Sequence, residues 1–494
     1  MTTAGRAILS TAVAALLAAC TVGPNFRPPT GPSEATYATP GDDIDNGAVR
    51  AAIGEKVVSD WWTLFRSPEL DRVMREAVAG NPTLAEARGR LEAAHQEVIA
   101  QTGKLMIDAN AGVERERLNL GAFSGGSFSS FSIPGFPSFP NNPEFNLYTL
   151  GGSLSYNLDL FGAVKRRKES LLATEQAQAR ALDAAYLTLT GQVVVQAFTI
   201  ADANLQLDEL NDVVAHDQSD LDMVRRAYAA GGASAADVAG LESQLAQDQS
   251  QLPAQRQRRE AARHQLAILV GKPPADWTAP DFTARSFTMP QTLPVSVPSE
   301  LLHNRPDIRE AEARLHSAVA EVGEATANLY PNINLTATLE QSALSPDKLF
   351  AATSTGWTLA AGLTAPIFHS GELKAKQREA EANARVALAA YELTVLQAFG
   401  QVADVLSAIA HDNQAYEAQR RALEAAQSRV DMMRRGYALG GVSELQLVDA
   451  ERDWSRTRLA VTQQSYSRAG DAAALLYTVA DVPPGAAEQP TKTD

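Results

Sequence analysis

A long, regular hydrophobic ladder is the feature of this sequence that most restricts its fold. Between positions 182 and 228, ladder residues recur in alternating steps of four and three, and only Gln196 and Asp217 among them are polar. A spacing of 3.5 residues kept over this length is typical of a left-handed coiled-coil seam rather than of a globular helix. It predicts one helix from about Ala163 to Ala229, which would be about 100 Å long at 1.5 Å per residue.

The same ladder occurs twice in the chain. The phrase RRAYAAGGAS, which starts at Arg225, returns as RRGYALGGVS at Arg434, 209 residues later (434 − 225 = 209), and a second ladder over 391–437 keeps the same register. NPTLAEARGRLEAA from Asn81 likewise corresponds to RPDIREAEARLHSA from Arg305. We therefore interpret most of the chain as two structural repeats. The predicted division is 60–270 for the first repeat, 271–304 for an equatorial linker, 305–480 for the second repeat and 481–494 for a C-terminal tail.

Each ladder ends in paired glycines followed by a serine. Glycine commonly ends a helix, and serine is a good N-cap for the next one. The phrases therefore predict two helix-hairpin tips, near 228–234 and 437–443, with returning helices over about 234–270 and 443–480. The tip residues that we single out are Tyr228, Gly231, Gly232 and Ser234 in the first repeat and Tyr437, Gly440, Gly441 and Ser443 in the second.

Short stretches in which apolar and polar residues alternate predict four strands. They lie at about 106–118, 146–161, 332–341 and 354–367, two in each repeat, and their length of about ten residues suits transmembrane β-barrel strands. Four membrane strands cannot close a barrel, and an open edge in lipid leaves backbone groups unpaired. Copies of the chain must therefore share a barrel, with two, three or four subunits giving 8, 12 or 16 strands. The Phe-rich segment 119–145 would be the extracellular end of the first strand pair, in a role that the sequence leaves open.

The N-terminus reads as a cleaved lipoprotein signal. The apolar run AILSTAVAALLAAC is too short to span a bilayer and ends at Cys20, the one cysteine of the chain. Leu-Ala-Ala-Cys resembles a bacterial lipobox, so we expect a signal peptide over 1–19, acylation of Cys20 and a lipidated N-terminal segment over 20–59. The residue after the cysteine is Thr21 and not the aspartate that would resemble an inner-membrane retention signal, so the outer membrane is favoured. The alternative is an ordinary signal peptide with an incidental cysteine.

Composition and motifs argue against two other classes of function. The net charge of −15 and the pI near 5.1 exclude the basic surface that nucleic-acid binding normally requires. The seven histidines are scattered, and no HExxH, GxSxG or glycine-rich phosphate loop after a strand is present. We therefore expect no catalytic residues, no metal site and no cofactor apart from the covalent lipid on Cys20.

The chain resembles the TolC-like outer membrane factors, and specifically their lipoprotein (NodT-type) branch, which serves RND efflux pumps. The resemblance covers nearly the whole chain and rests on its most specific phrases. These are LAAC, CTVGPNFRPP, WWTLFRSPELDRVMREAVAGNP, RPDIREAEARL and RRGYALGGVSELQLVDAER. It implies a mixed, mainly α fold that forms a homotrimer: an outer-membrane β-barrel of 12 strands, a 12-helix periplasmic α-barrel tunnel and a small equatorial domain. It also implies a periplasmic adaptor protein, an inner-membrane RND-type transporter and outer membrane lipid as partners.

The resemblance also assigns roles to individual residues. It places a periplasmic gate at Leu445, Asp449 and Arg452, and Arg452 lies one helical turn from Asp449. A solvated helix face is the alternative, and the first repeat has Ala236 and Gly240 at the positions of Leu445 and Asp449. The tips would dock the adaptor, or simply end the helices. The last set is basic and lies at the barrel rim, where it would contact lipid headgroups or remain ordinary solvated charge: Lys165, Arg166, Arg167, Lys168, Lys374, Lys376 and Arg378.

The patterns predict a pore through a membrane, and the resemblance implies that it is the outer membrane channel of a tripartite efflux pump that passes small molecules to the exterior. A conduit for type I protein secretion is the alternative within the same class. A lipid-anchored coiled-coil scaffold would explain Cys20 and the ladders but would leave the four alternating stretches unexplained.

Overall fold

The computed structural model describes residues 21–30, 50–53, 60–119, 144–290, 292–295, 302–480 and 482. The chain divides into two compact units. The first consists of Met1–Arg27, Ala93–Glu175 and Ala313–Leu388, and the second of Pro28–Glu92, Gln176–Glu312 and Ala389–Asp494. Each unit combines parts of both repeats, so the repeats of the sequence are not the compact units of the structure. The predicted signal peptide, Cys20, most of the 119–145 segment and nearly all of the tail lie outside the described residues.

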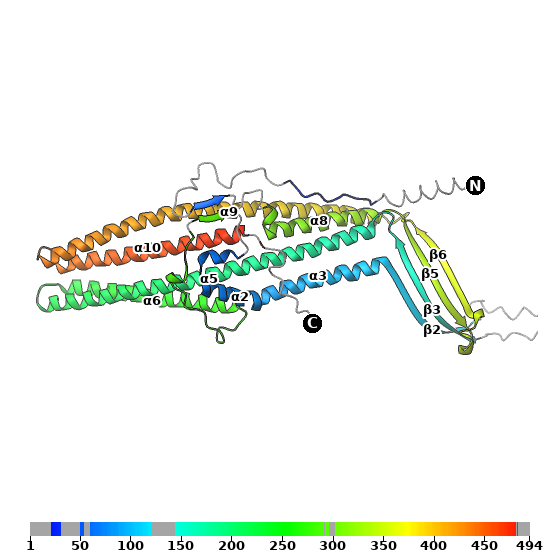
Figure 1. The fold of residues 1–494 in the computed structure, drawn as a ribbon, viewed down its shortest axis with the longest axis horizontal. Helices are drawn as coiled ribbons and strands as arrows, with labels where there is room; N and C mark the ends of the chain where they lie inside the picture. The colour runs from blue at the N-terminus through cyan, green and yellow to red at the C-terminus, as the bar shows by residue number, and fades with distance from the viewer. Residues whose placement is uncertain are drawn as a thin grey trace, which may run out of the picture. The chain divides into compact units, whose positions relative to one another are not determined.

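A four-stranded antiparallel sheet forms one end of the first unit (Figure 1). Its strands are β2 (Ile107–Asn119), β3 (Glu144–Leu158), β5 (Asn332–Ala343) and β6 (Thr355–Thr364), in the order β2-β3-β5-β6. Short turns η4 (Pro346–Lys348) and η5 (Ala352–Ser354) connect β5 to β6. Among the described residues, the outer edges of β2 and β6 pair with no further strand. The four predicted strands are therefore present and form one open sheet.

The register of this sheet confirms its two-faced pattern. Ala111, Gly152, Leu339 and Trp357 lie opposite one another across the strands, and the neighbouring row is polar: Asn110, Ser153, Thr338 and Thr358. Successive residues of a strand point to opposite faces, so one face is apolar and the other polar. The apolar face is uncovered in this chain, since Trp357 is 76% exposed.

The long helices have the predicted positions. α5 (Ala163–Ala229) and α9 (Glu372–Ala438) each contain 67 residues, and each is followed by a returning helix, α6 (Ala235–Leu269) and α10 (Glu444–Val479). In α5 the ladder is buried almost without interruption from Leu182 to Val224. The ladder therefore packs as the apolar seam that its spacing predicts. Two shorter helices, α3 (Pro82–Met106) and α8 (Pro306–Ala327), lead into β2 and towards β5.

The aromatic phrase WWTLF builds the core of the second unit. It forms η1 (Trp61–Phe65), which α2 (Pro68–Gly80) follows, and both Trp61 and Phe65 are fully buried. The Phe65 ring meets the edge of Phe198 in α5 at 5.0 Å between centroids. Aromatic pairs of this geometry add to the gain from burial. The phrase therefore anchors the chain to the middle of the long helix.

The arginine-proline-aspartate phrase is also structural. Arg305 is buried and ion-pairs with Asp307 at 2.6 Å, and its Nη2 donates to Gln401 Oε1 of α9 at 2.9 Å. The pair fixes the start of α8 against α9. The 271–304 segment contributes η3 (Ala284–Ser286) and β4 (Thr292–Val295), and β4 pairs in parallel with β1 (Arg50–Ile53), a small sheet that the sequence patterns do not predict.

Candidate functional site

The two hairpin tips have the same backbone design. Gly231 and Gly440 adopt φ of +79° and +74°, and the amides of the next residues, Gly232 and Gly441, donate back to carbonyls five residues earlier at 2.8 and 2.9 Å. This is the Schellman ending of a helix, which favours glycine because it requires a left-handed residue. The tips therefore end their helices as the paired glycines predict, and the side chains of Tyr228 and Tyr437 are exposed beside them.

The returning helices begin with matched capping boxes. The Ser234 hydroxyl accepts from the Asp237 amide at 3.2 Å, and the Ser443 hydroxyl accepts from the Gln446 amide at 3.3 Å. The side chains of Asp237 and Gln446 in turn accept from the serine amides. Each box satisfies backbone groups that a helix start leaves open. Both tips are therefore rigid turns with exposed surfaces.

Equivalent arginines brace the two hairpins just behind their tips. Arg225 pairs with Glu242 at 2.6 Å, and Arg434 pairs with Glu451 at 2.9 Å. Both pairs link a descending helix to its returning helix. The arginines open the repeated phrase, but their glutamate partners lie 17 residues further on, and sequence reasoning did not connect them.

The predicted gate residues lie on the first turns of α10. Leu445 and Asp449 are exposed, and Arg452 Nη1 lies 3.8 Å from Asp449 Oδ1, so the predicted helical pair is formed. Arg452 also reaches the other hairpin, because its Nε lies 3.6 Å from Oδ1 of Asp217 in α5. Arg452 therefore links the two hairpins within one chain.

Asp217 is one of the two polar members of the first ladder. The sequence pattern showed it as an exception without explaining it, and the structure makes it a functional candidate. Its side chain is 1% exposed, and neither carboxylate oxygen has a hydrogen-bond partner among the described residues. Burial, and then the neighbouring Asp248, raise the pKa of Asp217 to about 7, although Arg452 opposes that rise. Burial and Glu451 raise the pKa of the adjacent Asp220 to about 6. Arg452 thus faces a buried carboxyl group whose pKa is raised to about 7.

The basic residues at the strand-to-helix junction divide into two groups. Five of them are exposed, as a headgroup contact requires: Lys165, Lys168, Lys374, Lys376 and Arg378. Arg167 is half-buried and lies 3.7 Å from Glu324 of α8. Arg166 departs from the prediction, because it is 3% exposed and its guanidinium is occupied by groups of its own chain. It contacts the segment that follows Cys20, which the basic run alone could not indicate.

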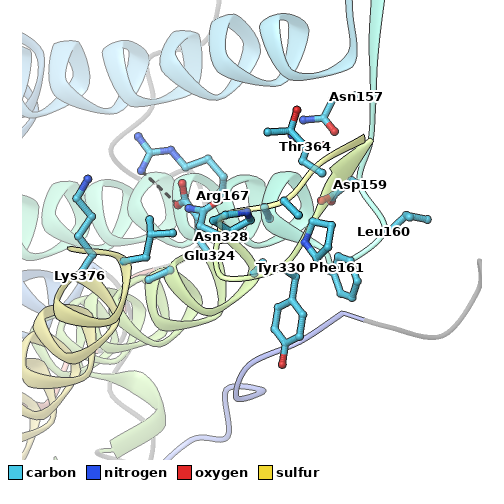
Figure 2. A pocket seen from close by; sticks show the side chains of 18 of the residues that line it. Asn157, Asp159, Leu160, Phe161, Arg167, Glu324, Asn328, Tyr330, Thr364 and Lys376 are labelled. Carbon is cyan, nitrogen blue, oxygen red and sulfur yellow. Dashed lines mark ion pairs between the residues drawn. The ribbon is translucent and has the colours of Figure 1, made fainter. Parts of the chain in front are cut away.

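A cavity of about 580 Å³ lies at the same junction, within the first unit (Figure 2). Its wall contains the Arg167–Glu324 pair, and Lys376 of α9 also lines it. The Phe161 and Tyr330 rings, also in its lining, stack at 4.7 Å between centroids. Burial raises the pKa of Glu324 against the opposing effect of Arg167. The cavity thus combines charged groups of both signs with an aromatic wall where the strands end.

Comparison with known proteins identifies this arrangement. The family model described as outer membrane efflux protein matches residues 73–272 and 297–479. Nodulation protein T of Rhizobium leguminosarum bv. trifolii is 27% identical over 485 residues, which are 96% of each chain. The pyoverdine export outer membrane protein OpmQ of Pseudomonas aeruginosa is 29% identical over 84% of this chain and 86% of its own. The solved structure of the outer-membrane channel OprN matches with a TM-score of 0.82 and 25% identity, over 94% of this chain and 99% of that one.

Proposed function

The chain belongs to the outer membrane efflux protein family, and from that premise we propose that three copies of it form the outer membrane channel of a tripartite efflux pump. The observation that carries this proposal is the open sheet, whose outer strands β2 and β6 pair with no further strand among the described residues. An open edge in hydrocarbon costs several kcal/mol for each unpaired backbone group. Neighbouring copies would close the sheet into a 12-stranded barrel with the apolar face towards lipid and the polar face towards the pore.

Two measurements on purified protein test this channel. Light scattering in detergent, corrected for bound detergent, should give the mass of three chains, and planar bilayers should show stepwise conductance. A monomer without conductance would contradict the proposal. The relative OpmQ is named for pyoverdine export, which supports small molecules as cargo. Drug sensitivity of a deletion strain, with protein secretion unchanged, would separate efflux from type I secretion.

Asp449 and Arg452 would form the periplasmic gate, and Leu445 its apolar constriction. Threefold repetition would place three Asp449 carboxylates around one axis, and such a ring favours cations. Asp449→Ala should therefore lower the cation preference measured in asymmetric salt, whereas Asp208→Ala, an exposed change on α5, should not. An unchanged reversal potential in Asp449→Ala would remove this assignment.

The tips would dock a periplasmic adaptor protein that links the channel to an inner-membrane RND-type transporter. Their exposure, their rigid caps and their small residues support this role. A cysteine placed at Leu439, which is 87% exposed, should cross-link to the adaptor, whereas one at exposed Ile99 of α3 should not. Equal cross-linking from both positions would contradict tip docking.

Cys20 would carry the lipid, and the exposed basic residues at the junction would face the headgroups of the inner leaflet. Mass spectrometry of the mature N-terminal peptide tests the first point, because acyl groups add a defined mass that Cys20→Ser removes. Replacing Lys165, Lys168 and Lys374 with glutamine should weaken binding to anionic vesicles relative to neutral ones. Equal binding of both proteins to anionic vesicles would contradict the headgroup role.

A further inference from the structure

The residues directly after Cys20, Thr21–Arg27, bind to the first unit, and we call them the arm. We call the residues that hold the arm the seat: Phe161, Gly162, Lys165, Arg166, Glu169, His316 and Gly323. The Val22 amide donates to the Phe161 carbonyl at 3.1 Å, and the Lys165 ammonium lies 3.4 Å from the Thr21 hydroxyl. Phe161 lies between the end of β3 and the start of α5. The first residues of the arm are therefore fixed at the point where the strands meet the helices.

Arg166 is the centre of the seat. Its Nη2 donates to Asn25 Oδ1 at 2.7 Å and to the Gly23 carbonyl at 3.4 Å, and its Nε donates to the Val22 carbonyl at 3.4 Å. Its Nη1 donates to Glu169 at 2.8 Å. A buried guanidinium is stable only when its donors are satisfied, and here the arm supplies most of the acceptors. The start of α5 and the arm therefore stabilise each other.

The shapes of arm and seat match closely. Gly23 has φ +89°, and a Cβ built there would lie 2.5 Å from Cα of Gly323 in α8. A Cβ at Gly162, which has φ +81°, would lie 2.6 Å from Thr21 Cγ2, and one at Gly323 would lie 2.8 Å from Arg166 Cδ. Contacts below 3.0 Å force a shift of the backbone or side chain. The arm therefore packs so closely against the first unit that only glycine fits at these three positions.

The far end of the arm is fixed by a second contact that shares a residue with the first. Phe26 stacks on His316 of α8 at 4.4 Å between centroids and 13° between planes. His316 Nε2 lies 2.9 Å from Glu169 Oε1, and Glu169 is also the carboxylate that binds Arg166. Glu169 thus joins the supports at both ends of the arm.

We propose that the arm acts as a mount for the lipid anchor. By this we mean that Arg166 and its glycine neighbours fix the height of the lipid-bearing residue relative to the barrel. This inference rests on the proposed acylation of Cys20. Cys20 lies outside the described residues, but a peptide bond joins it to Thr21, and consecutive Cα atoms are about 3.8 Å apart. The acyl chains therefore enter the bilayer at the strand-to-helix junction and not at the end of a free tether. Arg166 is a positioning residue, and the lipid is the group that it positions.

Hydrogen–deuterium exchange of the peptide covering the arm tests the mount directly. The Val22 amide, which donates to the Phe161 carbonyl, should be protected in the wild type and equally in Cys20→Ser, since the seat and not the lipid holds it. Arg166→Ala should speed exchange by at least about tenfold, because a hydrogen bond to a charged group contributes at least that factor to an equilibrium. The arm variant Gly23→Ala should also speed exchange, because its Cβ would lie 2.5 Å from Gly323 Cα and displace the arm. Arg90→Ala, an exposed arginine of α3, is the charge-matched control. Loss of protection in Cys20→Ser, or its retention in both seat variants, would overturn the mount.

A second measurement tests the link to the lipid. In cells, Arg166→Ala and Gly23→Ala should lower the amount of heat-stable outer-membrane oligomer by a few fold in the acylated protein and have no further effect in Cys20→Ser. Gly23→Ala changes the arm alone, so it keeps the test valid if Arg166→Ala fails to fold. Equal losses in both backgrounds would show that the seat acts on folding rather than on anchoring. If mass spectrometry finds no acyl group, the proposed lipidation of Cys20 is contradicted. The exchange result then still decides whether the seat holds the arm.

Discussion

The two long hairpins have descending helices of equal length but bury them to different extents. In α5 the ladder is buried nearly throughout, whereas in α9 the buried positions become rare beyond Asn413, with Val430 the exception. The equivalent leucines show the contrast most clearly, because Leu187 in α5 is 8% exposed and Leu396 in α9 is 65% exposed. Leu393 and Val386 of α9 are exposed as well. One repeat has thus been packed by its own chain, and the other presents an apolar face that a single chain leaves uncovered.

This difference indicates how a duplicated chain can build a closed tube. Contiguous exposed apolar faces are typical of interfaces. In an assembly of copies, the first hairpin would provide the folded core of each subunit, and the second would provide the surface against which the next subunit packs. The open sheet does not divide in this way, since each repeat contributes one open edge, β2 from the first and β6 from the second. The four predictions below test this division.

Leu396→Glu should have the largest effect, because it places a charge in the face that a neighbouring copy would cover. We expect the trimer to be replaced by monomer at micromolar concentration, with the helix content of the chain retained. Light scattering and circular dichroism measure the two quantities. Leu396→Met is the matched control and should still assemble. Trimers of normal mass from Leu396→Glu would show that this face is not an interface.

Leu187→Ala should destabilise the chain itself. A buried leucine-to-alanine change costs about 2–5 kcal/mol in the free energy of unfolding. The equivalent change Leu396→Ala should cost less than about 0.5 kcal/mol in the monomer, because that side chain is exposed. Urea unfolding measures both losses in a Leu393→Glu background, in which a charge stands on the same exposed face of α9 and we expect a monomer. Equal losses would mean that the two helices are buried alike in solution.

The regular parts of the fold could be predicted from the sequence, because they depend on local chemistry. The helix at Ala163–Ala229 follows from a spacing of 3.5, the strands follow from alternation, and the tips follow from Gly231 and Gly440. The Asp449–Arg452 pair followed from helical spacing. The roles of Arg166 and Asp217 could not be predicted, because each depends on which distant segment packs against it. Periodicity marks a face as apolar without showing what covers it.

The stability of both hairpins should fall as the pH rises from about 4 to about 7. Burial and Asp248 raise the pKa of Asp217 to about 7, and burial and Asp412 raise that of Asp471 in α10 to about 7. In that window the folded chain binds more protons than the unfolded chain, so the stabilisation present below pH 4 is lost as the pH rises.

Asp217→Asn and Asp471→Asn should each flatten this slope, with a gain of about 2 kcal/mol at pH 8 relative to the wild type. Unfolding at pH 4, 6 and 8 measures the slope, and exposed Asp208→Asn on α5 is the control. The two acids lie in different hairpins, so similar responses would limit the contrast between the hairpins to their apolar faces. A steeper slope in either variant would contradict the raised pKa.

The smallest effect concerns the tips, where the two repeats are most alike. Ser234→Ala and Ser443→Ala each remove a hydroxyl that accepts from a helix amide, at 3.2 and 3.3 Å respectively. Loss of such a cap costs about 1 kcal/mol, whereas serine-to-glycine costs only a few tenths. Hydrogen exchange of the first turns of α6 and α10 should therefore quicken by a similar factor in both alanine variants and little in the glycine variants. A loss confined to one tip would mean that the difference between the hairpins extends to their ends, and that a docking partner meets two unlike surfaces there.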